Sequence, residues 1–174
     1  MELKNSKTHD NLMAAFGGET QAFAKYLYFS KAAENEGYMQ LGSIFRTIAE
    51  NEKQHAKIWF KLLGGLSETL ENLNNAQSGE HYENAQMYPS FAKTAREEGF
   101  SEIARLFEEV GKIEKTHEEC YKTLISEMNS GKIFSKDTDV FWICRNCGHI
   151  HIGTDAPEIC PVCEHPKGYF EVKC

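Results

Sequence analysis

Four cysteines in two closely spaced pairs place the strongest constraint on what this chain can fold into. Cys144 and Cys147 form the first C-x-x-C pair, Cys160 and Cys163 form the second, and twelve residues separate the pairs. This spacing can present four thiolates to one metal ion at the corners of a tetrahedron. The residues from 140 to 174 are too few to bury a sufficient apolar core, so a bound metal must contribute to their folding.

The composition disfavours several other classes of protein. The net charge of −7 is spread along the 174 residues, which argues against nucleic acid and anionic membrane as partners. No apolar run approaches the ~18 residues of a membrane-spanning helix, and the N-terminus lacks the apolar stretch of a secretory signal. Six cysteines without such a signal favour metal thiolates in a reducing cytoplasm over disulfides.

Long helical segments are predicted upstream of the cysteine pairs. Each ends near a glycine, as helices commonly do, and lengths of about 25 residues suit a four-helix bundle. Pro89 falls within the third segment and should kink it or break it locally. The predicted helices cover 9–35, 39–63, 69–98 and 101–128, and a polar linker over 130–139 leads to short strands joined by the cysteine pairs.

The helical part contains one pattern of glutamate and histidine twice. In each half, a Glu-x-x-His pair lies on one helix and a lone glutamate lies on the helix before it. The lone glutamates are 61 residues apart and the pairs are 62 residues apart, which indicates two duplicated helical hairpins. The first set is Glu19, Glu52 and His55, and the second set is Glu80, Glu114 and His117.

This repeated pattern predicts a site for two metal ions. Residues three apart on a helix share a face, so the glutamate and the histidine of each pair can hold the same ion. One glutamate from each of two helices and a Glu-x-x-His pair from each of the other two form the ligand inventory of a di-iron carboxylate bundle. A single pair arises often by chance on a solvated face, but two copies at near-equal spacing favour the metal site.

Three further residues extend the predicted site. Glu83 is an additional carboxylate three residues after Glu80, at a position where the first half has Ala22. Tyr26 and Tyr88 lie about two turns after the lone glutamates, where their hydroxyl groups can hydrogen-bond a ligating carboxylate. The alternative for each tyrosine is packing in the core.

Together these features resemble the rubrerythrins, and the resemblance extends over nearly the whole chain. The C-terminal part alone resembles a rubredoxin with a shortened insert between the cysteine pairs. The matching stretches are Gly-Glu-Thr-Gln-Ala at 18–22, Ala-Glu-Asn-Glu-Lys-Gln-His-Ala at 49–56, Gly-Glu-His-Tyr-Glu at 79–83, Met-Tyr-Pro at 87–89, Ala-Arg-Glu-Glu-Gly at 95–99, Cys-Arg-Asn-Cys-Gly at 144–148 and Cys-Pro-Val-Cys at 160–163.

The resemblance implies an all-α four-helix ferritin-like bundle over 1–134 and a small metal-stabilised rubredoxin-like β domain over 135–174. It implies two iron ions in the bundle and one iron ion held by the four cysteines. The implied catalytic residues are Glu83, His55, Tyr26 and Tyr88, and one iron exchanges the histidine for the carboxylate of Glu83 on oxidation. The implied di-iron ligands are Glu19, Glu52, Glu80, Glu83, Glu114, His117 and, in the reduced state, His55.

The activity implied by the resemblance is that of a non-haem iron peroxidase, which reduces hydrogen peroxide to water and protects the cytoplasm from oxidative stress. The chain has no G-x-G-x-x-G pattern for NAD(P)H, so electrons are expected from rubredoxin or an NAD(P)H-dependent reductase through the Fe(Cys)4 centre. Three alternatives remain open: iron storage as a ferroxidase, an O2-activating hydroxylase, and a zinc-ribbon interaction protein on a helical bundle.

The length of the chain between the two hairpins bears on assembly. In a ferritin-like bundle the second and third helices run parallel, so their connection must return about 31 Å along the bundle and about 10 Å across it. The predicted connection over 64–70 spans at most about 28 Å. Either the helices alternate in direction with a short turn, or the first hairpin of one chain packs on the second hairpin of another. The second arrangement, a domain-swapped homodimer, is favoured.

Overall fold

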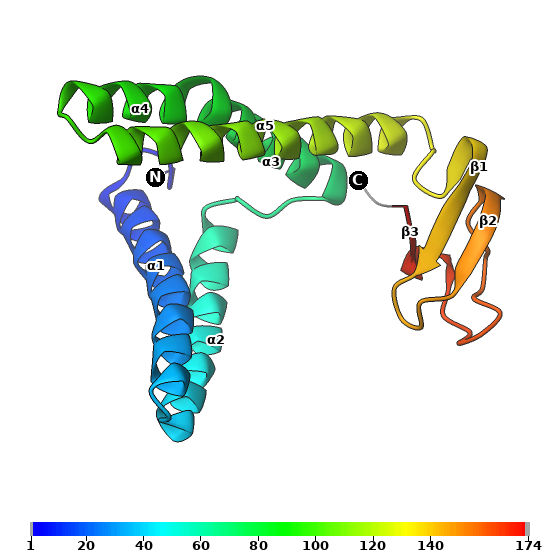
Figure 1. Ribbon diagram of the computed structural model, residues 1–174, viewed down its shortest axis with the longest axis horizontal. Coiled ribbons are helices and arrows are strands. Elements are labelled where there is room, and N and C mark those ends of the chain that lie inside the picture. The colour runs from blue at the N-terminus through cyan, green and yellow to red at the C-terminus, as the bar shows by residue number, and fades with distance from the viewer. Residues whose placement is uncertain (1, 173–174) are drawn as a thin grey trace. The chain divides into compact units, whose positions relative to one another are not determined.

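A computed structural model describes residues 2–172, which form helices up to Asn129 and a small sheet from Ser135 onward (Figure 1). The chain divides into two compact units, Met1–Ser67 and Glu68–Cys174. No helix within the described range combines the length and the apolar character that crossing a membrane requires.

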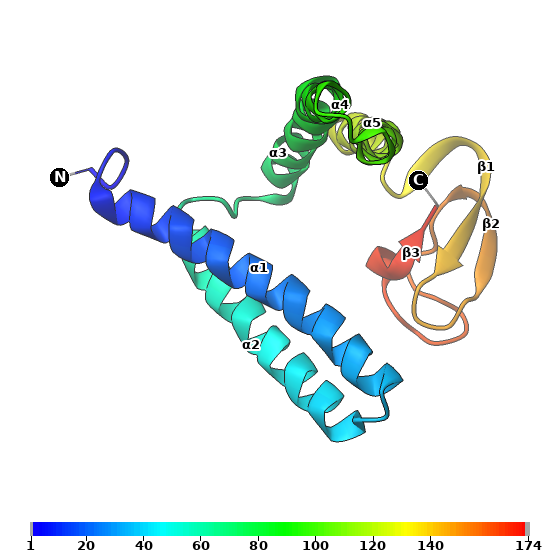
Figure 2. The ribbon, with the colours of Figure 1, turned by 60° about the vertical axis from the view of Figure 1, so that its left-hand side comes forward.

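The first unit is a hairpin of two long helices, α1 (Lys7–Asn35) and α2 (Met39–Leu62), which lie side by side in Figures 1 and 2. The side chain of Ser6 caps α1 by accepting a hydrogen bond of 3.1 Å from the backbone N–H of His9. The helices approach closely at Gly42, whose carbonyl accepts a hydrogen bond of 2.8 Å from the buried hydroxyl of Ser30. Small residues at this contact let the two backbones come together.

The helical part of the second unit consists of α3 (Thr69–Tyr82), the π-helix η1 (Glu83–Met87), α4 (Tyr88–Glu97) and α5 (Ser101–Asn129). Both α3 and α4 pack on α5, and Ala92, Ala95 and Ala104 form a buried contact there. The expected disruption near Pro89 takes the form of η1, and Pro89 itself is the second residue of α4. A proline lacks the N–H that the i→i−4 bond needs, and its ring clashes with the carbonyl four residues earlier. A wide turn before the proline relieves this crowding.

The C-terminal residues form a small antiparallel sheet in the order β2-β1-β3, from β1 (Ser135–Cys144), β2 (Ile150–Asp155) and β3 (Phe170–Glu171), with a 3-10 turn, η2 (Lys167–Tyr169), before β3. Its core contains Trp142 and Phe170 together with two of the cysteines. The expected linker over 130–139 is too long, because Ser135 already pairs with Asp155 of β2. An irregularity between Ser135 and Val140 then interrupts the register, and the polar residues there conceal the strand in the sequence.

Apart from that strand, the predicted boundaries agree with the structure. The helices predicted over 9–35, 39–63 and 101–128 end within two residues of α1, α2 and α5. The third predicted helix, 69–98, corresponds to α3, η1 and α4, which follow one another without a break from Thr69 to Glu97. Glycines placed directly after the periodic segments explain this agreement, because they are frequent helix stops.

Candidate metal centres

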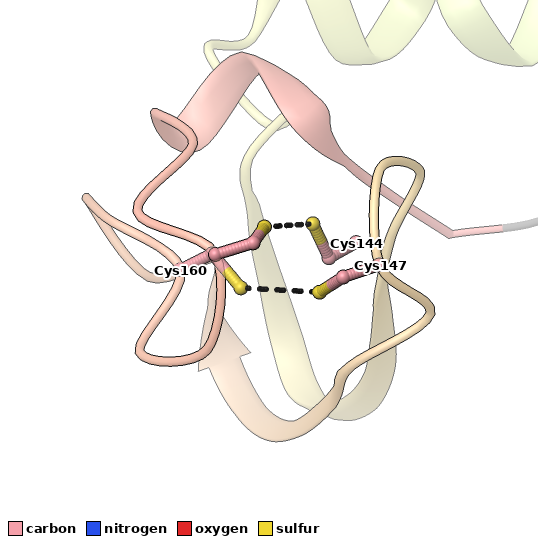
Figure 3. A group of neighbouring side chains, drawn as sticks. Cys144, Cys147 and Cys160 are labelled. Atoms are coloured by element: carbon pink, nitrogen blue, oxygen red, sulfur yellow. Dashed lines mark hydrogen bonds between the residues drawn. The ribbon is translucent and has the colours of Figure 1, made fainter.

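The four cysteines face one another at the end of β1 and in two turns (Figure 3). Their sulfur atoms all lie within 4.8 Å of one another, and Sγ of Cys144 is 3.7 Å from Sγ of Cys163. Sγ of Cys147 is likewise 3.7 Å from Sγ of Cys160. A tetrahedral metal ion with bonds of about 2.3 Å to sulfur requires sulfur atoms about 3.8 Å apart. The two distances of 3.7 Å therefore match the separation that one tetrahedral ion needs.

Both cysteine pairs use the same backbone hydrogen bonds. In the first, the N–H of Gly148 donates to the carbonyl of Cys144 at 2.8 Å, and the N–H of Cys144 donates to the carbonyl of His149 at 2.8 Å. Gly148 has a φ of +77°, a left-handed conformation that glycine adopts without strain. This local turn brings the two thiols of a pair to the same side.

The second pair has the same two hydrogen bonds. The N–H of Glu164 donates to the carbonyl of Cys160 at 3.0 Å, and the N–H of Cys160 donates to the carbonyl of His165 at 2.8 Å. The residue with positive φ is Glu164 here, at 59°. A hydrogen bond from the backbone N–H of His165 lowers the pKa of the Cys163 thiol to about 6, which favours the thiolate that binds a metal.

The first helical set brings Glu19 on α1 together with Glu52 and His55 on α2. One ligand atom from each lies within 4.8 Å of the others. Nδ1 of His55 is 2.8 Å from Oε2 of Glu52 and 3.9 Å from Oε1 of Glu19. The side chain of His55 is about half exposed, so its imidazole lies at the open side of the hairpin.

The second helical set has the same geometry on different helices. Glu80 on α3 and the pair Glu114 and His117 on α5 also place one ligand atom each within 4.8 Å. Nδ1 of His117 is 2.7 Å from Oε2 of Glu114 and 3.6 Å from Oε2 of Glu80. Burial and the charge of Glu114 raise the pKa of Glu80, as expected where two carboxylates lie close together.

Thus the sequence repeat is also a repeat of side-chain geometry. Each set offers two carboxylates and one imidazole, which are ligands that iron accepts. The two sets contain four glutamates and two histidines, which is the ligand inventory of a di-iron carboxylate protein, and the cysteines supply a tetrathiolate site for a further ion. Chemically, such an arrangement suits the storage and transfer of electrons.

Glu83 and Tyr88 border the second set. Glu83 is the first residue of η1. Among the described residues, the ligand atoms that cluster in the second set come from Glu80, Glu114 and His117, and Glu83 is not one of them. Its charge nevertheless acts on Tyr88, whose pKa is raised first by burial and then by Glu83. The ring of Tyr88 lies 6.1 Å from that of Phe107, and its hydroxyl group keeps its proton at neutral pH.

Tyr26 lies in the first hairpin among other aromatic residues. Its ring centroid is 6.2 Å from the rings of Phe29 and of Phe45. This is a packing contact of the kind that half-buried tyrosines commonly make. A role for its hydroxyl group at the metal site stays a prediction.

Sequence reasoning missed Glu118, which the structure places close to the second set. Its side chain is buried, and its two oxygen atoms accept hydrogen bonds from Gln77, His81, Asn84 and Lys122. Hydrogen bonds from Lys122 and Asn84 lower the pKa of Glu118 to about 2, so the carboxyl group is ionised. The polar residues at spacings of four and three on α3 and η1 were the available signal, because they mark one helix face.

Both the helical part and the cysteine-containing part of this chain match models of known protein families. A family model described as rubrerythrin matches residues 10–125, and one described as the rubredoxin-like domain of rubrerythrin matches residues 142–171. The rubrerythrin of Porphyromonas gingivalis is 42% identical over 97% of this chain and 91% of its own length. Those of Nitratidesulfovibrio vulgaris and Clostridium perfringens are 42% and 44% identical, each over 98% of this chain and 96% of the relative.

Proposed function

Because this chain belongs to the rubrerythrin family, we propose that it is a non-haem iron peroxidase that reduces hydrogen peroxide to water. The observation that carries the proposal is the presence, in one chain, of two matching Glu2His sets and a tetrathiolate cluster. We further propose that the protein acts in the cytoplasm against oxidative stress. Residues 1–134 would hold two iron ions and residues 135–174 would hold one.

Reduction of one peroxide molecule to two water molecules takes two electrons and two protons. Iron bound in the paired sets would supply both electrons and would act as a Lewis acid toward the departing oxygen atoms. The carboxylates of Glu52 and Glu114 would offset the positive charge there, because each lies within 4.8 Å of the other ligand atoms of its set.

We assign a redox-linked exchange of ligands to His55 and Glu83. A carboxylate offsets the larger charge of the oxidised metal, whereas a neutral imidazole suits the reduced metal. The asymmetry of the two halves supports this assignment, because Glu83 has Ala22 as its counterpart in the first half. Tyr88 retains its proton at neutral pH, so its hydroxyl group can donate a hydrogen bond to a ligating carboxylate, and Tyr26 is proposed to do the same.

The four cysteines are proposed as the point of electron entry. A thiolate-bound iron ion accepts one electron at a time, which suits transfer from rubredoxin or an NAD(P)H-dependent reductase. Cys147 and the nearby Val162 are exposed, so a donor protein can approach the cluster closely.

The proposed assembly is a homodimer with exchanged hairpins. Glu52 lies ten residues before the end of α2 at Leu62, and Glu80 lies eleven residues after the start of α3 at Thr69. In a ferritin-like bundle the connection must therefore return about 32 Å along the axis and step about 10 Å sideways. Seven residue steps from Leu62 to Thr69 span at most about 25 Å. This shortfall supports pairing of each hairpin with the complementary hairpin of a second chain.

The proposed function is tested by metal analysis followed by titration of the reduced protein with hydrogen peroxide under anaerobic conditions. We expect iron at both kinds of site, a red colour from ferric tetrathiolate, and oxidation of the paired site by one equivalent of peroxide. A colourless protein with zinc in the cysteine site would favour an interaction module, and a cage-sized native mass would favour iron storage. Oxidation only by O2, with an organic product, would favour a hydroxylase.

A further inference from the structure

The π-helix η1 begins at Glu83, the carboxylate that only the second hairpin possesses. The matching helix of the first hairpin, α1, runs without such a turn from Lys7 to Asn35. Each turn of a π-helix contains about one residue more than an α-helical turn, so the direction of a side chain changes where the π-helix begins. The direction of Glu83 therefore depends on how firmly this wide turn is held.

Asn84, the residue after Glu83, connects the π-helix to α3 and α5 through hydrogen bonds of its side chain. Its amide nitrogen donates to the backbone carbonyl of Glu80 at 2.9 Å and to Oε2 of Glu118 at 2.7 Å. One primary amide has two N–H hydrogens, so both are used. The first bond links Asn84 to α3 on one side of Glu83, and the second links it to α5.

Glu118 is well suited to hold that bond in one geometry. It is 4% exposed, and within residues 2–172 it is the only charged side chain that is buried. Oε1 accepts hydrogen bonds from Gln77 at 3.2 Å and from His81 at 3.0 Å, and it lies 2.8 Å from Nζ of Lys122. The other oxygen atom, Oε2, accepts the hydrogen bond from Asn84. A buried carboxylate with both oxygen atoms satisfied has little freedom to move.

Glu118 also connects the wide turn to the metal ligands. It is the residue after His117 and lies one helical turn after Glu114 on α5, which is a continuous helix from Ser101 to Asn129. A displacement of Asn84 relative to Glu118 would therefore displace Glu83 relative to these two ligands. Pro89 explains why the α-helix is interrupted. The hydrogen bond between Asn84 and Glu118 holds the π-helix in a fixed position relative to α5.

We propose that Asn84 and Glu118 are positioning residues that hold the π-helix so that Glu83 can reach the metal site. This inference rests on the proposed role of Glu83 as an exchanging ligand. The hydrogen bond from Asn84 fixes the turn that carries Glu83, and the other partners of Glu118 keep its carboxylate in place. Neither Asn84 nor Glu118 is required to touch metal or substrate.

The test uses the iron-loaded full chain with Asn84→Leu, which keeps the size of the side chain but removes both N–H donors. We expect unchanged iron content, a Mössbauer spectrum of the oxidised protein shifted toward that of Glu83→Ala, and oxidation by hydrogen peroxide about tenfold slower. Hydrogen exchange of the backbone amides at 83–88 should be faster. Asn84→Ser, which is too short for the bond to Glu118, should act in the same direction and serves if the leucine variant does not fold.

The matched control is Asn74→Leu, the same substitution at an exposed position of α3, where the amide donates to the backbone carbonyl of Leu70 and not to Glu118. It should leave the spectrum and the rate unchanged. The double variant Asn84→Leu with Glu83→Ala should be no slower than Glu83→Ala alone, because Asn84 is proposed to act through Glu83.

Three results would overturn the inference in different ways. If Glu83→Ala is slow while Asn84→Leu has the parent spectrum and rate, the role of Asn84 is wrong and the proposed function stands. If the two effects multiply in the double variant, Asn84 acts on something other than Glu83. If Glu83→Ala itself changes neither spectrum nor rate, the proposed ligand exchange fails and the inference fails with it.

Discussion

Nδ1 of His117 lies 2.7 Å from the carboxylate oxygen of Glu114, one helical turn before it on α5. The equivalent pair on α2 has a separation of 2.8 Å. Two helices from different hairpins thus present an imidazole and a carboxylate at nearly the same spacing, with a further glutamate beside each. The two sets therefore repeat one arrangement of ligand atoms, once in each hairpin.

Cys144→Ser separates electron entry from peroxide chemistry. Loss of one thiolate should remove the red mononuclear centre and loosen residues 135–174, because metal binding contributes to their folding. The reduced dimetal site should still react once with peroxide, but turnover with an external donor should fall to near zero. Absorption spectra and steady-state assays measure these effects. Thr138→Ala, at an exposed position of β1 away from the cysteines, is the control and should keep both properties. Full turnover by Cys144→Ser would show that electrons enter elsewhere.

Glu83→Ala should leave iron bound, since six ligands remain in the two sets. Loss of the fifth carboxylate removes the proposed partner of His55, so peroxide reduction should slow by about ten- to a hundredfold. Stopped-flow oxidation of the reduced protein by peroxide gives the rate. Glu97→Ala, at an exposed position at the end of α4, is the control and should behave as the parent. Parent-like kinetics in Glu83→Ala would make this residue a bystander.

Mixing two inactive variants tests the exchange of hairpins. Glu52→Ala and Glu114→Ala damage different hairpins, so a swapped heterodimer has one doubly damaged site and one intact site. Co-refolding equal amounts should recover about a quarter of the parent activity if the chains pair at random. As a control, Glu52→Ala mixed with His55→Ala should recover nothing, because both changes lie on α2. A first mixture as inactive as this control would mean that each chain builds its own site.

Gly42→Ala should destabilise the first hairpin although alanine is the better helix former. A Cβ atom at this position would lie 2.6 Å from Cγ of Glu34 and 3.1 Å from the carbonyl oxygen of Ser30. Glu34 cannot move away freely because it is paired with Arg46. Overpacking of this kind costs about 1–3 kcal/mol, against a gain of about 1 kcal/mol in helix propensity.

The measurement for this prediction is thermal or denaturant unfolding of the two variants. The free energy of unfolding of Gly42→Ala should decrease by about 1 kcal/mol. Ser43→Ala, at the next and exposed position of α2, should change it little or increase it slightly. An increase in Gly42→Ala would mean that α1 and α2 separate easily at this point.

Much of the site could be predicted because its geometry is local. Glu52 and His55, like Glu114 and His117, share a face of one helix through their spacing alone. The cysteine pairs are equally local, since a short turn brings the members of each pair together. In contrast, the early start of β1 at Ser135 was missed, because the polar segment that begins this strand lacks the alternating apolar pattern of a strand.

Periodicity, glycine stops and ligand spacing act over a few residues, so the helical segments, the two metal-binding patterns and the family can be recognised from the order of amino acids alone. The folded structure was needed to establish that Glu118 is buried and that Asn84, 34 residues earlier, donates to it. It also decided that the disruption before Pro89 is a π-helix that begins at Glu83. The physical reason is that burial and contacts between helices depend on which faces pack together, and spacing along one segment does not specify this.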